Sequence, residues 1–228
     1  IANALETDHI RPLDAAPDLS ASIIADTTNL VALAGVEQIQ TALDTGAEII
    51  IAGRATDTAV IAALPIARGC HKGAAWHGAK IAECGALATT NPNSGVILMT
   101  FDDSGFVITP MAEDAAATPY TVSAHMLYEN SDPFILYEPG GYLDVTEAHY
   151  DAIDDRSVRV EGSRWHETSP YTVKLEGARC AGYQSVSLVL VRDTHYRENL
   201  EEWVAALEES FARKAQARHL SDVSLEIR

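Results

Sequence analysis

The sequence predicts an α/β front part built of parallel βαβ units, followed by an α+β part with antiparallel strands and a C-terminal amphipathic helix. Within the apolar run over 47–52, Ile49-Ile50-Ile51 is continuous and β-branched, which is typical of a strand that is buried on both faces. Short apolar segments separated by turn residues after residue 95 indicate antiparallel strands. Over 196–218, apolar residues recur at helical spacing on one face: Leu200, Trp203, Leu207 and Phe211.

The front part, residues 1–94, is expected to alternate strands and helices. After a polar loop over 1–20, we predict a strand over 22–25, a helix over 31–43, a strand over 49–51, and helices over 58–67 and 76–87. Strands joined through a helix in one sheet run parallel with a right-handed crossover. The polar loops after the two strands, 26–29 and 53–57, should therefore meet at the carboxyl edge of the sheet, where ligands bind.

The rear part covers residues 95–228, with a soft boundary near 92–95. Asp102-Asp103-Ser104-Gly105 stands between two apolar runs, which predicts a β-hairpin. A short helix is expected over 120–128. The remaining predicted strands are 142–145, 157–161, 171–176 and 185–191.

Composition narrows the class of protein. With 228 residues, of which 47% are hydrophobic, the chain can form one large or two small globular domains. Its net charge of -17 makes nucleic-acid binding improbable, because an acidic surface repels phosphates. No signal peptide and no apolar run of ~20 residues is visible. The three cysteines, Cys70, Cys84 and Cys180, are odd in number and lack metal-type spacing, so we expect a protein of the reducing cytoplasm. The chain begins at Ile1 without an initiator methionine, and we expect a piece of a longer protein or a protein whose termini were trimmed.

Charged side chains stand at the ends of the predicted apolar elements. Arg54 follows the 47–52 run and could hold a carboxylate or phosphate, while Asp57 could orient the ligand or act as a base. The alternative is an Arg54–Asp57 pair that only caps the next helix. Glu83 could act as a general acid or base if it is buried. Cys84 is better explained as a small buried residue than as a nucleophile.

Weaker candidates lie nearby. Asp26 and Asn29 could belong to the site or only to a turn. Thr56 can cap the following helix. His77 precedes Glu83 by six residues, not by the four that place two metal ligands on one helical face. The common motifs of nucleotide-binding proteins, serine hydrolases and zinc enzymes are missing from the sequence.

Four blocks, in this order, resemble the acyclic terpene utilisation AtuA family. They are GAEIIIAGRATD at 46–57, GAKIAECGALAT at 78–89, HMLYENSDP at 125–133, and RSVRVEG at 156–162 with TVKLEG at 172–177. Two positions depart from the family pattern: His77-Gly78 stands near the family's GH with the order changed, and Thr89-Thr90-Asn91 replaces T-G-G. Members also carry an amino-terminal glycine-rich segment and further α/β structure that this sequence lacks. The resemblance implies breakdown of branched acids as CoA thioesters, together with a small partner subunit.

The combined hypothesis is an enzyme of carboxylic-acid or acyl-CoA catabolism, a lyase, hydratase or isomerase that works by proton transfer. Asp57 and Glu83 would move the proton. The predicted substrate-binding residues are Arg54, Asp26, Asn29, Thr56, His77 and Asn91. No metal ligands are assigned, and a divalent metal or a CoA thioester remains open as cofactor or substrate. The alternative is a non-catalytic subunit or ligand-binding module that completes a site on a partner chain, and in either case we expect an oligomer.

Overall fold

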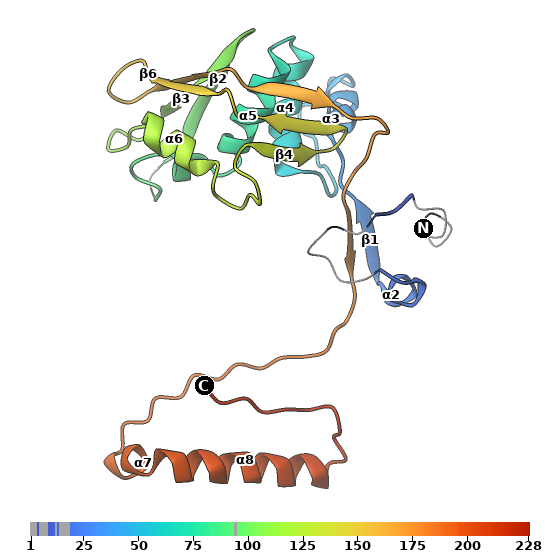
Figure 1. Ribbon diagram of the computed structural model, residues 1–228, viewed down its shortest axis with the longest axis vertical. Coiled ribbons are helices and arrows are strands. Elements are labelled where there is room, and N and C mark those ends of the chain that lie inside the picture. Colours follow the sequence, from blue (N-terminus) through green and yellow to red (C-terminus); the bar gives the residue numbers. More distant parts are fainter. Residues whose placement is uncertain (1–3, 5–8, 12, 14–18, 94) are drawn as a thin grey trace. The chain divides into compact units, whose positions relative to one another are not determined.

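The computed structural model describes residues 4, 9–11, 13, 19–93 and 95–228. The chain forms two compact units, Ile1–Cys180 and Ala181–Arg228, and Figure 1 gives the order of their elements. The boundary near residue 94, predicted between an α/β part and an α+β part, remains a prediction. Within the first unit, helix α5 (Lys72–Ala82) packs on strands that follow this boundary, such as β3 (Gly105–Pro110).

The described strands of the first unit form three sheets, in the orders β2-β3-β7-β6, β4-β5-β8 and β1-β9. Every pairing within them is antiparallel. The parallel βαβ front part predicted from the sequence is therefore wrong. Besides β3, the strands are β1 (Asn29–Ala32), β2 (Ile97–Phe101), β4 (Ile135–Glu138), β5 (Gly141–Asp144), β6 (His149–Ala152), β7 (Val158–Glu161), β8 (Arg164–Glu167) and β9 (Leu175–Ala178).

Two predicted strands of the front part are absent. The 22–25 segment lies in helix α2 (Ala21–Asp26), because the Ser20 hydroxyl caps it by accepting a hydrogen bond from the Ile23 amide at 3.2 Å. The 49–51 segment belongs to no strand, and Ile49 and Ile51 are 81% and 93% exposed. Parallel pairing in the described chain is limited to one isolated bridge, between Ala34 and Ala55. β1 instead pairs with β9, a partner that local sequence does not specify.

The helices agree better with the sequence. Of the helix predicted over 31–43, the start lies in strand β1 and only the rest is helical, as α3 (Val36–Leu43). Helix α4 (Asp57–Ala67) begins as expected after its cap Thr56. The predicted 76–87 helix is α5 followed by the short 3-10 helix η1 (Gly85–Ala88), and the 120–128 helix is α6 (Pro119–His125). Small residues let α5 approach the strands closely, since a Cβ on Gly73 would lie 2.4 Å from the Ser163 carbonyl oxygen.

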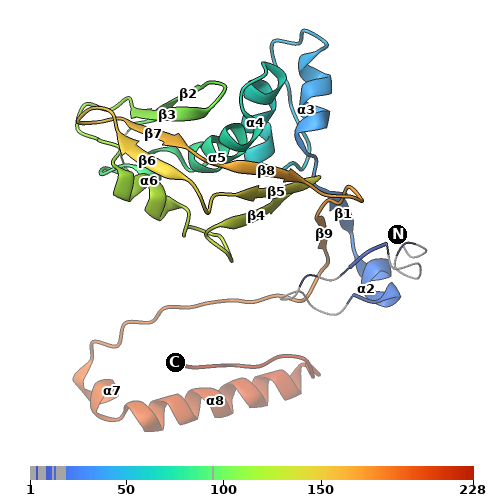
Figure 2. The ribbon, with the colours of Figure 1, turned by 45° about the horizontal axis from the view of Figure 1, so that its top comes forward.

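The core of the first unit lies between α5 and the two larger sheets (Figure 2). Trp76 of α5 stacks on Trp165 of β8 at a ring separation of 4.6 Å. The predicted hairpin is confirmed as β2 and β3, and the predicted strands over 142–145 and 157–161 correspond to β5 and β7. The 171–176 strand begins later, as β9, while β4, β6 and β8 were not predicted.

The second unit contains α7 (Thr194–Glu198) and α8 (Leu200–Ala217), so the C-terminal helix is confirmed with a break at Asn199. The predicted 185–191 strand is absent: this segment carries no strand, and Leu188 is 93% exposed. None of the helices in the described part of the chain has the length and hydropathy needed to cross a membrane.

Candidate functional site

A shielded charge cluster, composed of Lys80, Glu83 and Thr58, lies where α5 ends and α4 begins. The Lys80 ammonium donates to Glu83 Oε1 at 2.5 Å, and the Thr58 hydroxyl donates to Glu83 Oε2 at 2.7 Å. The side chains of Lys80 and Glu83 are only 14% and 10% exposed. Both oxygens of the Glu83 carboxylate are therefore held by defined donors with little access to water, which fixes its position.

Glu138, the last residue of β4, brings a second carboxyl group to this cluster. Its Oε2 atom is buried and has no hydrogen-bond partner among the described residues. Burial raises the pKa of Glu138, the hydroxyls of Thr56 and Thr58 oppose this rise, and the negative charge of Glu83 adds to it. Glu138 consequently keeps its proton to a higher pH than an ordinary glutamate.

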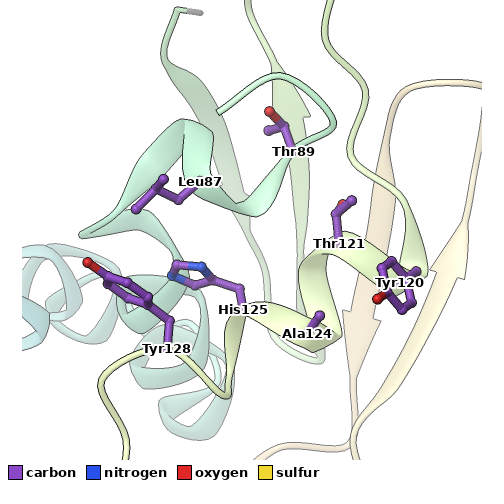
Figure 3. Close-up of a pocket in the computed structure, with 7 residues that line it drawn as sticks. All are labelled: Leu87, Thr89, Tyr120, Thr121, Ala124, His125 and Tyr128. Carbon is purple, nitrogen blue, oxygen red and sulfur yellow. The ribbon is translucent and has the colours of Figure 1, made fainter. Parts of the chain in front are cut away.

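His125, the last residue of α6, connects the cluster with a cavity. The cavity has a volume of about 320 Å³, and His125 lines it together with residues of α6 and η1 (Figure 3). Only 6% of His125 is exposed, and its Nε2 atom has no partner in the described part of the chain. Burial lowers the pKa of His125, as does the charge of Lys80, while Glu83 acts in the opposite direction. The lowered pKa favours the neutral imidazole, and its Nε2 atom is buried without a hydrogen-bond partner among the described residues.

Cys84 and Asp57 border the same region. Burial raises the pKa of the Cys84 thiol, and the charges of Glu83 and Asp57 raise it further. Cys84 therefore stays a thiol and is a poor nucleophile, in agreement with the sequence-based interpretation. Asp57 is exposed at the first position of α4, so the two residues predicted to move a proton, Asp57 and Glu83, lie in one neighbourhood.

Other predicted binding residues lie in different surroundings. Arg54 is paired with Glu176 of β9 at 2.7 Å, and its side chain is 58% exposed. Asp26 ends α2 and Asn29 begins β1, both exposed. The Asn91 amide donates to Asp114 at 2.7 Å. Of the predicted binding residues in the described chain, only Thr56 acts on the pKa of Glu138, which its side chain lowers.

His77 lies in the core of the first unit with 0% of its surface exposed. Its Nδ1 atom is 2.7 Å from the Ser163 hydroxyl, and its Nε2 atom is 3.3 Å from the Tyr150 hydroxyl. Burial lowers the pKa of His77 to about 3. A neutral imidazole with both nitrogens engaged is a structural element, and the predicted role in substrate binding has no support from this position.

Sequence reasoning missed Lys80, His125 and Glu138. Lys80 and His125 stand inside the family-like blocks at 78–89 and 125–133, which was the available signal. Glu138 lies in a strand that periodicity did not indicate, and 55 residues separate it from Glu83, so only the fold brings the two carboxyls together. Among the described residues, no group of three or more His, Cys, Asp or Glu is placed to hold a metal ion.

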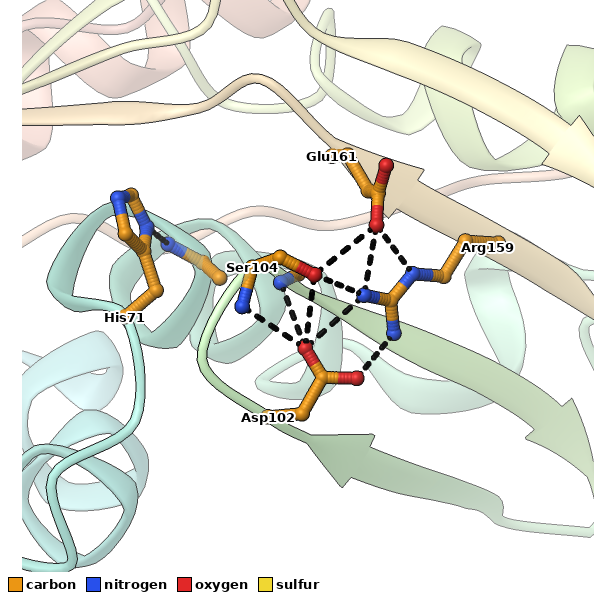
Figure 4. Close-up of polar contacts among 7 residues, drawn as sticks. His71, Asp102, Ser104, Arg159 and Glu161 are labelled. Carbon is orange, nitrogen blue, oxygen red and sulfur yellow. Dashed lines mark hydrogen bonds and ion pairs between the residues drawn. The ribbon is translucent and has the colours of Figure 1, made fainter.

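A separate polar network lies at the β2–β3 turn, where Arg159 stands between two carboxylates (Figure 4). Arg159 donates to Asp102 Oδ2 at 2.5 Å and to Glu161 Oε1 at 2.8 Å, and Asp102 also accepts the amides of Ser104 and Gly105. The hydrogen bonds from Arg159 lower the pKa of Asp102. This network closes the hairpin and is structural.

We expect Asp102→Ala to lower the free energy of unfolding by about 1–2 kcal/mol, since the carboxylate is partly exposed to water. A lowered pKa gives stability that is present above the ordinary pKa of aspartate and lost as the pH falls. Urea unfolding should therefore show that Asp102→Ala is less stable than the native protein at neutral pH, and this difference in the free energy of unfolding should shrink in acid. Asp103→Ala, an exposed neighbour, is the control, and an equal loss there would contradict the assignment to this network.

Comparison with known proteins gives one result. No curated protein and no solved structure matches the chain. The profile of the acyclic terpene utilisation family protein AtuA matches residues 3–227, nearly the whole chain, which confirms the family indicated by the four sequence blocks. The chain therefore belongs to the AtuA family of acyclic terpene utilisation proteins.

Proposed function

We propose that this chain catalyses a proton transfer in the catabolism of a carboxylic acid or its CoA thioester, as a lyase, hydratase or isomerase. Acyclic terpene utilisation is compatible with a catabolic role. The observation that carries the reaction type is the shielded Lys80–Glu83 pair, whose charges act on a histidine at the wall of a cavity.

The roles follow from the geometry. Glu83 is the proton acceptor, because its carboxylate is held by two donors in a fixed place with little water. Lys80 supplies the positive charge that keeps this carboxylate in a poorly hydrated position. His125 lines the cavity, and burial favours its neutral form, so its ring would lie against the carbonyl or carboxylate of a substrate bound there. Asp57 remains a candidate for a second proton-transfer role.

Hydrogen–deuterium exchange tests the reaction class even while the product is unidentified. The protein would be incubated in D₂O with branched carboxylic acids and their CoA thioesters, and deuterium uptake into each compound would be followed by mass spectrometry. A general base that removes a carbon-bound proton catalyses this exchange even when the complete reaction stalls. Uptake in one compound class would identify the substrate class, and no uptake in any would count against proton transfer.

The predicted anion-binding role of Arg54 has its own test. Di- and tricarboxylates and acyl-CoA thioesters that bind the native state should raise the melting temperature by mass action. We expect Arg54→Ala to lose this rise. Glu176→Gln is the control, because it frees Arg54 from its ion pair and should keep or increase the rise. Equal stabilisation of the native protein and Arg54→Ala would remove Arg54 from the site.

A second candidate function is a non-catalytic subunit that completes a site on a partner chain. It is favoured by the exposed apolar segments 47–52 and 185–191, in which Ile51 and Leu188 are each 93% exposed. Unpaired apolar segments of this kind are typical of surfaces that associate. Deuterium exchange by the chain alone would argue against this alternative, and exchange that requires a small partner subunit would support it.

A further inference from the structure

We propose that α8 forms an antiparallel pair with α8 of a second copy of this chain, through an apolar stripe on one side of the helix. The residues of this stripe are three or four positions apart and therefore share one face: Leu200, Trp203, Val204, Leu207 and Phe211. The inference concerns the second unit and does not depend on the reaction proposed for the first.

The stripe is not buried within its own unit. None of the residues of α8 is buried, and Leu200 and Leu207 are 46% and 41% exposed. Helix α7 reaches only the start of the stripe, where the Tyr196 ring lies 5.9 Å from the ring of Trp203. The C-terminal tail runs beside α8 (Figures 1 and 2), yet its own Leu225 is 39% exposed. The stripe therefore lacks a complete cover within this unit.

A helix of this kind needs a packing partner. α8 has 18 residues, and a single helix of about this length is only marginally stable in water. In proteins, most of the stability of a helix comes from packing of its apolar face against another element. A second amphipathic helix that covers the stripe would supply this stability.

The distribution of charge along α8 indicates that the partner is a second α8. The first part of the helix is acidic and the last part is basic, with Glu201, Glu202, Glu208 and Glu209 followed by Arg213 and Lys214. In an antiparallel pair, the basic end of each helix lies beside the acidic start of the other, and two-fold symmetry repeats this contact at both ends. A parallel pair would instead bring like charges together. The helix is thus complementary to itself in the antiparallel direction.

The stripe is also complementary to itself in this direction. When Leu207 of one copy faces Leu207 of the other, Trp203 lies opposite Phe211, because both are equally far from the centre. Two aromatic contacts then flank a central leucine contact, which suits a closed apolar interface. Lys214 continues the line of the stripe beyond Phe211, so its ammonium group would lie near Glu201 of the second copy.

Light scattering of the full chain after size exclusion, over a range of concentrations, tests the pairing. We expect the native chain to reach twice the mass of one chain. Leu207→Glu places a charge at the centre of the stripe and should weaken association by roughly 10²-fold or more. A native chain that stays monomeric at every concentration, or an unchanged mass in Leu207→Glu, would overturn the proposal.

A charge exchange tests the antiparallel direction. Lys214→Glu and Glu201→Lys should each weaken association by roughly 10-fold, because the contact occurs twice in each pair, and the double variant should restore it. Glu209→Lys is the control, since it makes the same change in charge on the side of α8 opposite the stripe and should associate like the native chain. These variants keep the stripe intact, so they decide the question even if Leu207→Glu unfolds α8. A double variant without restored association, or an equal loss in Glu209→Lys, would reject the antiparallel pair.

Discussion

Glu83→Gln should abolish deuterium exchange, with a loss of roughly 10²–10⁴-fold, while the fold is retained. The amide has the shape of the carboxylate, its oxygen can still accept from Lys80, and its NH2 group can donate to the Thr58 hydroxyl, but it cannot take a proton from a substrate. The effect is expected to be this large because Glu83 is the carboxyl group that the fold holds in one position with two donors. Exchange rates measured by mass spectrometry, together with circular dichroism, check the prediction.

The matched control is Glu167→Gln. Glu167 is also paired with a lysine, since its carboxylate lies 2.6 Å from the Lys72 ammonium. This pair is much more exposed, however: 54% of the Lys72 side chain and 70% of the Glu167 side chain are accessible. We expect no change in exchange rate and little change in stability, because water screens this exposed ion pair. If Glu83→Gln unfolds because Lys80 is left without its counter-ion, the double variant Lys80→Gln, Glu83→Gln removes both charges. Exchange at the native rate in a folded Glu83 variant would refute the role of Glu83.

The stability of the first unit should fall steeply as the pH drops below 6.5, because His77 is buried as a neutral imidazole. Its pKa in the folded state is about 3, against 6.5 in the unfolded chain. Between these values the unfolded state binds one more proton, so the free energy of unfolding decreases by about 1.4 kcal/mol per pH unit. Over three pH units this amounts to roughly 4 kcal/mol, a large part of the stability of a typical domain.

Urea unfolding at a series of pH values measures this slope. His77→Gln removes the titrating ring and keeps groups that can bond to Ser163 and Tyr150, so it should show the smaller pH dependence. His149 is an exposed histidine on β6, so His149→Gln should show the same dependence of stability on pH as the native protein. Identical slopes in His77→Gln and the native protein would show that His77 is not the source of the effect.

Local signals in the sequence predicted the helices and the hairpin. Thr56 marks the start of α4 through its side-chain cap, and Asp102 to Gly105 form the turn between β2 and β3. Short-range hydrogen bonds of this kind depend on residues close in sequence, so the pattern is sufficient to place them. The C-terminal helix follows for the same reason, from its own apolar periodicity.

The parallel sheet was wrong because an apolar run specifies only a tendency to be extended. The run over 47–52 has the composition of a buried strand, yet Ile49 and Ile51 are exposed and belong to no strand. Strand pairing is a long-range choice: β1 pairs with β9, and β4 to β8 pair only among themselves or with β3. Composition within a window of ten residues contains no information on that choice.

The sequence by itself determined the family, the net negative charge and the main helices, and it named Glu83 as a candidate for the site. Only the tertiary structure decided which groups surround Glu83 and that His77 belongs to the core. Lys80 is three residues from Glu83 and within reach on the same helix, but Thr58, His125 and Glu138 come from α4, α6 and β4. Their burial, and the pKa shifts of His125 and Glu138 that follow from it, arise from packing between elements distant in sequence.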